Sequence, residues 1–466
     1  RHVDRAGYGA YQALFTAVIL ASIVLRAGIG EAFVRFYFED HDGARRERIA
    51  RTATAAVAWS TTVACALGVL FAAPLSTLLL GQRDPLLADC ALVGLWSFTN
   101  LEMAYAQLRV DERAGTYLRA STANVAMTVT FTVALVVFAG QGARGLLLGN
   151  FGASALVVLG LWWNLRRRLS LRVRRSDLGA MLRFGLPTVP ADAGVYTLQV
   201  ADRFYLYRGY GHAAAGEYSI ALQLATVVYV FVRGFQYAWP PLAYSIEHDD
   251  QAARLYALVS TYFVLATGVV VAAVTLLGRW LVRLLAAPEY FGAHSALPWL
   301  ALAWTLYGLY QVTLAITGRA RATARNVPAA LLGLAVNVVL LILLAGRSGA
   351  GLGITGAAIA LCGAYVVMLA AMLALTRRLF AVPFEWARLA LLAAILAGVA
   401  VSGELLLPRA GLAGFAARAA WLTLIAPALL GARFFSAPER AQARALLAGL
   451  RARASREGTA GPPQEG

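Results

Sequence analysis

The chain contains thirteen long apolar runs, and these limit its possible folds more than any other feature. A helix needs roughly 20 apolar residues to cross a hydrocarbon core about 30 Å thick. With 60% hydrophobic and only 14% charged residues, the chain also has too little polar material to cover a soluble protein. We therefore predict an all-α, polytopic membrane protein with spans at 9–31, 52–74, 86–108, 117–139, 145–164, 180–207, 213–237, 255–277, 297–317, 327–345, 353–375, 387–407 and 412–432.

The arginines orient these predicted spans. All 41 basic residues are arginine, and most lie in the short segments between apolar runs, which argues against a nucleic-acid-binding surface. The segments between spans must lie alternately on the two sides of the membrane. If segment 39–51 defines the first side, 27 arginines fall on that side and nine on the other. The positive-inside rule makes the first side cytoplasmic. The C-terminus is then predicted inside and Arg1 outside.

Cysteine and histidine give no sign of a metal site or cofactor. Cys65, Cys90 and Cys362 lie in separate apolar runs, and the five histidines are dispersed. That pattern matches neither a disulfide framework nor a zinc site. The sequence also lacks the motifs of soluble catalytic sites, so we do not expect an enzyme.

Two segments recur at almost the same separation. GAYQALFTAVILASIVLRAG from Gly9 resembles GEYSIALQLATVVYVFVRGF from Gly216, 207 positions later. AGQGARGL from Ala139 resembles AGRSGAGL from Ala345, 206 positions later. Equivalent spans of the two repeats are an even number of spans apart, so they cross the membrane in the same direction. We therefore predict two parallel repeats. The first repeat would lack its first helix, so we expect fourteen spans in the full protein and further residues before Arg1.

The repeats predict five regions. Residues 1–164 form an N-terminal bundle lacking its first helix, and 165–178 a basic cytoplasmic linker. Residues 179–378 form the C-terminal bundle, giving two six-helix bundles in the full protein. Two additional transmembrane helices follow at 379–435, and 436–466 is predicted as a basic, partly disordered cytoplasmic tail.

Two arginines inside spans occupy equivalent positions in the repeats. Arg26 and Arg233 each lie 15 residues after the matched tyrosine, hence at equal depth in the cytoplasmic half. Charges inside a membrane are costly and often functional, and arginine binds phosphate in a bidentate manner. We predict that the pair faces a cavity between the bundles. The alternative is that both side chains snorkel to the headgroups.

Three further features are candidates for a site or a gate. Arg35 lies nearer the cytoplasm, where it would either pair with Glu31 one turn back or bind phosphate at the cavity mouth. Pro187 and Pro190 would kink span 180–207, and Asp192 follows them as a gating or ion-coupling carboxylate. The alternative for Asp192 is a purely structural contact with freed backbone groups.

Several segments resemble the polysaccharide biosynthesis flippases of the multidrug/oligosaccharidyl-lipid/polysaccharide exporter superfamily. FGLPTVPADAGVYTLQVADRFYLYRGYGHAAAGEYSIALQLA is similar to that family's seventh and eighth helices. AGYGAYQ and GIGEAFVRFYFE are similar to its second helix. GRARATARNVPAALLGLAVNVVLLILLAGRSGAGLGITGAAIA is similar to its eleventh and twelfth. The likeness covers nearly the whole chain except the absent first helix.

This resemblance implies a V-shaped pair of bundles around a cationic cavity in a bacterial inner membrane. It implies alternating-access flipping of a polyprenyl-pyrophosphate-linked oligosaccharide to the outer leaflet, coupled to H⁺ or Na⁺, with membrane lipids, glycosyltransferases and a polymerase as partners. A lipid II flippase and a cation-coupled multidrug exporter are related alternatives. A membrane glycan polymerase or ligase, or a non-transporting scaffold, would be a different class.

Overall fold

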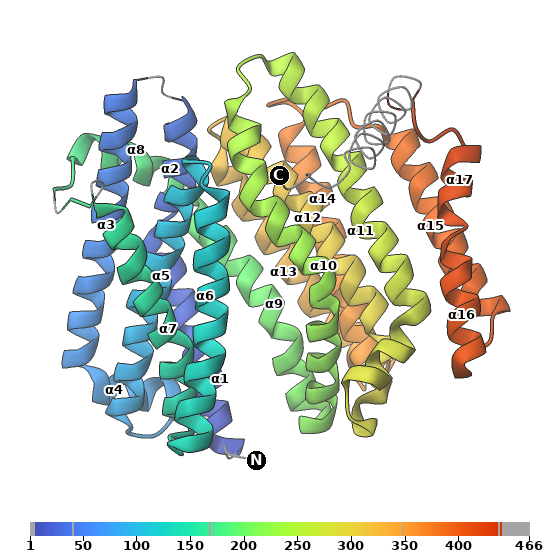
Figure 1. Ribbon diagram of the computed structural model, residues 1–466, viewed down its shortest axis with the longest axis horizontal. Helices are drawn as coiled ribbons and strands as arrows, with labels where there is room; N and C mark the ends of the chain where they lie inside the picture. Colours follow the sequence, from blue (N-terminus) through green and yellow to red (C-terminus); the bar gives the residue numbers. More distant parts are fainter. Residues whose placement is uncertain are drawn as a thin grey trace, which may run out of the picture.

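The computed structural model describes residues 5–39, 42–166, 169–170, 172–347, 349–436 and 439. Every element in these ranges is helical, as predicted. Two bundles stand side by side, with three further helices beyond the second bundle (Figure 1). We call the end at which α7 (Gly142–Asn164) ends and α8 (Arg175–Gly185) begins the linker end, and the end at which α1 (Arg5–Arg26) begins the N-terminal end.

Seven helices make up the first bundle. They are α1 (Arg5–Arg26), α2 (Ile29–Glu39), α3 (Gly43–Leu70), α4 (Ala72–Leu80), α5 (Pro85–Val110), α6 (Ala114–Val133), which ends in a π-turn at Ala134–Phe138, and α7 (Gly142–Asn164). Aspartates begin two of them: Asp42 accepts from the Ala44 amide at 2.9 Å, and Asp84 from the Leu87 amide at 3.1 Å. Such carboxylates satisfy amides that have no partner within the helix.

The second bundle begins with a broken helix and ends before the additional helices. Its elements are α8 (Arg175–Gly185), a 3₁₀ turn (Leu186–Thr188), α9 (Val189–Tyr210), α10 (His212–Ser245), α11 (Asp249–Leu285), a 3₁₀ segment (Pro288–Ser295), α12 (Leu297–Arg319), a 3₁₀ turn (Thr323–Arg325), α13 (Asn326–Leu340), which ends in a π-turn at Leu341–Ala345, and α14 (Gly353–Thr376). The additional helices are α15 (Trp386–Leu406), α16 (Gly411–Leu422) and α17 (Ile425–Gly431).

Most of the predicted spans coincide with helices that could cross a membrane. Within the described residues, ten helices or joined helices are long and apolar enough, and α1 with α2, bent by 41° at the break, makes an eleventh if the pair crosses as one span. The predicted spans 86–108 and 180–207 correspond to α5 and to α8–α9, which do not meet that test. They carry interior polar groups such as Asn100, Glu102 and Asp192, so their sequences are less apolar.

Two local features repeat in the structure at the spacing of the sequence repeat. The π-turns that begin at Ala134 and Leu341 are 207 positions apart. The glycines that follow them, Gly149 and Gly356, are 207 apart as well, and each lies directly against the backbone of the preceding helix. A β-carbon at either would approach that backbone within 2.6 Å. Both hairpins therefore pack through glycine, which allows helix backbones to approach closely.

The end of the predicted linker is helical. Helix α8 begins at Arg175, inside the predicted linker 165–178, and so belongs to the second bundle's first helix. Asp177 lies in its first turn and Arg183 in its last, where a negative and a positive charge, respectively, interact favourably with the helix dipole. These charges therefore stabilise the helix. The predicted tail 436–466 lies outside the described residues, apart from Ser436 and Glu439.

The breaks in the two bent helices touch. Gly28, between α1 and α2, has φ +67°, and its hypothetical β-carbon would lie 2.3 Å from the carbonyl oxygen of Gly185 at the end of α8. Ala27 beside it also has a positive φ of 48°. Only glycines allow the two backbones to meet this closely. The contact therefore fixes where α1 turns relative to α9.

Gly28→Ala should destabilise the protein by about 2 kcal/mol, since alanine combines an unfavourable left-handed conformation with a backbone clash. The control is Gly30→Ala, because a β-carbon there meets nothing within 4 Å. Thermal melting of the purified proteins in detergent measures the effect. Equal melting temperatures for the two variants would contradict the importance of the contact.

Candidate functional site

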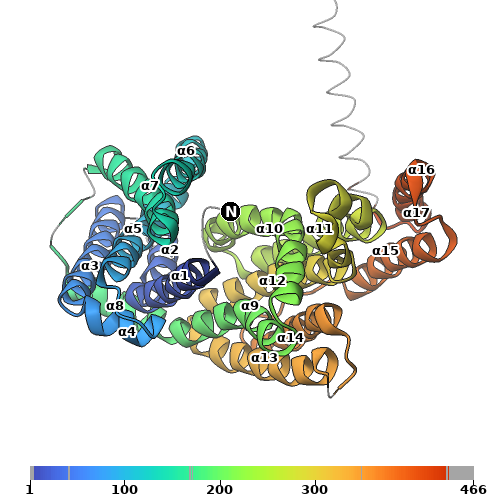
Figure 2. The ribbon, with the colours of Figure 1, turned by 90° about the horizontal axis from the view of Figure 1, so that it is seen from below.

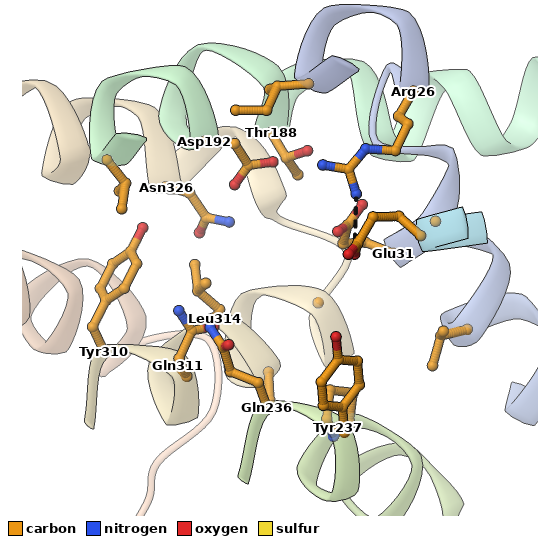
Figure 3. Close-up of a pocket in the computed structure, with 18 of the residues that line it drawn as sticks. Arg26, Glu31, Thr188, Asp192, Gln236, Tyr237, Tyr310, Gln311, Leu314 and Asn326 are labelled. Atoms are coloured by element: carbon orange, nitrogen blue, oxygen red, sulfur yellow. Dashed lines mark ion pairs between the residues drawn. The ribbon is translucent and has the colours of Figure 1, made fainter. Parts of the chain in front are cut away.

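A cavity of about 340 Å³ lies between the two bundles. Helices from both bundles contribute to its wall, and the side chains labelled in Figure 3 come from α1, α2, the 3₁₀ turn before α9, α9, α10, α12 and the start of α13. Its charged lining residues are three arginines and three carboxylates: Arg26, Arg109, Arg233, Glu31, Glu102 and Asp192. The structure thus places the predicted pair Arg26 and Arg233 at one cavity, one from each bundle.

Arg26 ends α1 at the helix break, so its side chain enters the cavity where the backbone turns away. Its Nη1 lies 4.0 Å from Oε2 of Glu102 on α5, and the two side chains are 23% and 20% exposed. The Nε atom of Arg26 is buried without a hydrogen-bond partner among the described residues. Arg26 therefore has an ion-pair partner yet keeps a free N–H donor.

Arg233 on α10 and Arg109 on α5 supply the other two cations. Arg233 lies over the ring of Tyr229, with its guanidinium carbon 5.3 Å from the ring centroid, and is exposed to the cavity. Arg109 lies over Tyr237 at 4.8 Å, and its buried Nε has no hydrogen-bond partner among the described residues. We had assigned Arg109 to a loop. Helix α5 extends to Val110, which brings this residue to the cavity.

Asp192 stands at the helix break of the second bundle. Pro187 lies in the 3₁₀ turn, and Pro190 is in the first turn of α9 together with Asp192. Proline is tolerated at these positions because the first amides of a helix have no partner within it. The side chains of Asp192 and Thr188 point toward those of Arg26 and Glu31 (Figure 3). The prolines therefore place a carboxylate in the cavity.

Arg35 lies at a contact between the bundles on the linker end, and it is absent from the cavity lining. The expected pair with Glu31 is wrong, because Nε of Arg35 lies 3.8 Å from Glu39, four residues later instead of four earlier. Its Nη2 donates to the carbonyl of Arg319 at 3.0 Å, and its guanidinium lies 5.4 Å from the ring of Tyr244.

A second charged contact crosses between the bundles beside Arg35. Glu39, which ends α2, forms an ion pair with Arg321, which follows α12. Tyr237 of α10 also packs on Tyr117 of α6, with ring centroids 4.8 Å apart. The ribbons of the two bundles diverge toward the N-terminal end (Figure 1).

Tyrosines and side-chain amides make up most of the remaining polar wall. The tyrosines are Tyr196, Tyr229, Tyr237, Tyr244, Tyr307 and Tyr310, and the amides are Gln199, Gln236, Gln311 and Asn326. Two residues after Arg233, Phe235 stacks on Trp239 in the hydrophobic core, with the ring centroids 5.4 Å apart. Ring faces and amides together suit a ligand with many hydroxyl groups.

Asp202 lies away from this cavity. Asp202 is 1% exposed and accepts a hydrogen bond from the hydroxyl of Tyr218 at 2.7 Å. Arg203 is exposed. Adjacent residues in a helix point in different directions, so neighbours in sequence rarely pair.

Comparison with known proteins assigns a family and a fold. The sequence profile of a family described as "Polysaccharide biosynthesis protein" matches residues 1–258. An outward-facing multidrug-resistance MATE transporter of the MOP superfamily is 15% identical with a TM-score of 0.67, covering 80% of this chain and 87% of its own. A MOP superfamily transporter from Pyrococcus furiosus, described as having a binding pocket of reverse polarity, is 16% identical with a TM-score of 0.67, covering 80% and 88%.

A third solved structure is similar to a slightly lower degree. The Vibrio cholerae MATE transporter VcmN in its bent form is 16% identical, with a TM-score of 0.60, covering 79% of this chain and 89% of its own. At these identities the likeness concerns the fold alone. No curated protein matches the chain.

Proposed function

The chain belongs to the polysaccharide biosynthesis protein family, and we propose that it flips a polyprenyl-pyrophosphate-linked oligosaccharide across the bacterial inner membrane for cell-surface polysaccharide synthesis. The substrate would move from the cytoplasmic to the outer leaflet by alternating access. The linker end would face the cytoplasm, as would the C-terminus, because the arginine-rich segments are predicted there. Glycosyltransferases would supply the substrate and a polymerase would consume it.

The observation that carries this proposal is the group of three arginines in one cavity. Arg26 and Arg109 each keep a buried Nε–H without a partner among the described residues, and Arg233 faces the same space. Burying such a donor without a partner costs free energy, which a bound anion would recover. A pyrophosphate offers several charged oxygens in the geometry that guanidinium groups bind. The tyrosines and amides would contact the first sugars.

The contacts between the bundles fit the outward-facing half of such a cycle. Arg35, Glu39 and Arg321 join α2 to the end of α12 on the linker side. In the proposed cycle these contacts close the cytoplasmic entrance and must break before substrate enters. Arg35 then acts at the gate, in place of the phosphate-capturing role we considered from the sequence.

Arg321→Glu should weaken this closure and raise the population open to the linker end by up to about five-fold, since a partly exposed ion pair contributes roughly 0.2–1 kcal/mol. The measurement is maleimide labelling of Gln311→Cys, a cavity position, in inside-out vesicles of a variant lacking the three native cysteines. Arg254→Glu is the matched control, because Arg254 is exposed on α11. Faster labelling in both variants, or in neither, would contradict a gating role for the pair.

A cation-coupled multidrug exporter is the second candidate, and one observation favours it. Three carboxylates, Glu31, Glu102 and Asp192, also line the cavity and would attract a cationic drug. In the proposed flippase, Asp192 and Glu31 instead bind the coupling H⁺ or Na⁺. A lipid II flippase would use the same arginines, so only the glycan distinguishes it from the first proposal.

Direct binding separates these candidates. We expect the purified protein in detergent to bind undecaprenyl pyrophosphate, measured by tryptophan fluorescence or calorimetry, more tightly than undecanol or ethidium. Deleting the gene should remove surface polysaccharide and leave drug sensitivity unchanged. Tight ethidium binding with no response to the pyrophosphate lipid would reverse the choice. Lipid II added as a competitor tests the third candidate.

A further inference from the structure

The cavity holds as many carboxylates as arginines, which is unexpected for a site that binds an anion. Among the described residues that line the cavity, three arginines face three carboxylates, so the formal charges of these six side chains cancel. The carboxylates are not equivalent. Among the described cavity residues, Glu102 alone lies within 4.0 Å of an arginine nitrogen. It also lies within electrostatic reach of Arg233 on the opposite bundle.

The position of Glu102 distinguishes it from a carboxylate that only stabilises the fold. It comes from α5 of the first bundle and lines the same cavity as Arg26 on α1 and Tyr229 and Arg233 on α10. Its contact with Arg26 is an ion pair at 4.0 Å, too long for a hydrogen bond. A loose pair of this kind leaves the guanidinium able to exchange its partner. The fold therefore offers Arg26 a carboxylate that a phosphate can displace.

An alternating-access carrier needs such a partner when it returns empty. As the bundles close over an empty cavity, Arg26 and Arg233 lose water, and an unpaired buried cation costs several kcal/mol. When substrate is bound, its phosphates neutralise these arginines. Without substrate, an anion from the protein itself must do so. Glu102 lies 4.0 Å from Arg26 and also interacts electrostatically with Arg233.

We propose that Glu102 is an internal counter-ion, which competes with the substrate pyrophosphate for Arg26 and permits the empty carrier to return. This inference rests on the proposed flippase function. In the loaded state the pyrophosphate displaces Glu102 from Arg26. After release, Glu102 pairs with Arg26 again and lowers the cost of closing the empty cavity. Glu102 is thus a positioning residue that acts through Arg26, without contacting the substrate.

Glu102→Gln tests both parts of the proposal, because glutamine keeps the shape and removes the charge. Removing the competitor should tighten binding of undecaprenyl pyrophosphate about two- to five-fold, the range expected for a partly exposed ion pair. Net flipping should slow about ten-fold or more. Each net cycle includes the return of the empty carrier, and in the variant the arginines buried during that return have lost their counter-ion. Tighter binding with slower turnover is a combination that a misfolded site would not produce.

The design uses two flipping assays in proteoliposomes with a fluorescent polyprenyl pyrophosphate. In the first, labelled lipid starts in one leaflet and no unlabelled lipid is present, so carriers must return empty. In the second, excess unlabelled polyprenyl pyrophosphate fills both leaflets, so carriers return loaded. Glu102→Gln should be slow only in the first assay. Glu102→Asp keeps the charge and should be less impaired, and Glu47→Gln, on the surface in an ion pair with Arg51, is the control.

The outcomes separate this inference from the proposed function. If the wild-type protein fails to bind or flip the pyrophosphate lipid, the proposed function itself is wrong. If the wild type is active but Glu102→Gln binds more weakly, or is equally slow in both assays, the counter-ion role is overturned. A Glu102→Asp variant as slow as Glu102→Gln in the empty-return assay would overturn it as well.

Discussion

Replacing Arg26 and Arg233 together with alanine should abolish surface polysaccharide while the protein still reaches the membrane. A hydrogen bond to a charged group contributes about 1.5–3 kcal/mol, so losing both arginines should weaken binding of a pyrophosphate lipid by roughly 10²–10⁴-fold. The removal also leaves Glu102 without its ion-pair partner. The repulsion between this carboxylate and the phosphates adds to the loss.

The measurement is complementation of a deletion strain, with polysaccharide quantified at the cell surface and undecaprenyl pyrophosphate binding measured on the purified variant. Arg208→Ala with Arg409→Ala is the control pair, because both arginines are exposed and lie outside the cavity. Normal polysaccharide export by the Arg26/Arg233 double variant would exclude a phosphate-binding role for the pair. The alternative from the sequence, that both side chains snorkel to headgroups, predicts that normal export.

The second large effect is expected where the additional helices join the second bundle. Arg418 of α16 is fully buried and bonds to Glu404 of α15. It also donates to three backbone carbonyls, those of Leu276 at 3.1 Å, Pro408 at 3.0 Å and Leu407 at 3.4 Å. One guanidinium therefore ties α11, α15 and α16 together.

Arg418→Ala should destabilise the protein by about 3 kcal/mol, near the lower limit for breaking a buried ion pair. The lower limit applies because Glu404 would still have two ion-pair partners, Arg279 and Arg409, each at 3.9 Å. The melting temperature in detergent should fall by roughly 3 °C. Arg409→Ala, whose side chain is 59% exposed, is the control and should lose less than about 1 kcal/mol. Similar shifts in the two variants would contradict a clamp at Arg418.

The sequence predicted the membrane-crossing helices well because their signal is local. An apolar run of about 20 residues has few options in a bilayer other than a helix. The repeat also predicted a shared location for Arg26 and Arg233, since equivalent positions in equivalent helices face the same central space. Their role in binding phosphate stays a prediction. The prolines likewise predicted the break before Asp192.

The partners of these residues were beyond the sequence. Glu102 was one polar residue among several in apolar helices, and only the packing of α5 against α1 brings it to Arg26. Arg35 has a carboxylate four residues away on either side, Glu31 and Glu39, so the sequence could not tell which of them it pairs with. In the structure Arg35 pairs with Glu39 and donates a hydrogen bond to the second bundle. Arg418 has no carboxylate within one helix turn in the sequence, and its acceptors come from α11 and α15.

The sequence by itself thus determined that the chain is helical, roughly where the helices lie, and that two halves repeat. These follow from hydropathy and spacing along the chain, which need no knowledge of neighbours. The tertiary structure decided which charges meet, where the bundles touch and which residues surround one cavity. The physical reason is that an ion pair depends on the distance between two side chains in space. Arg26 and Glu102 are 76 positions apart in the sequence, and only the packing of their helices sets the distance between them.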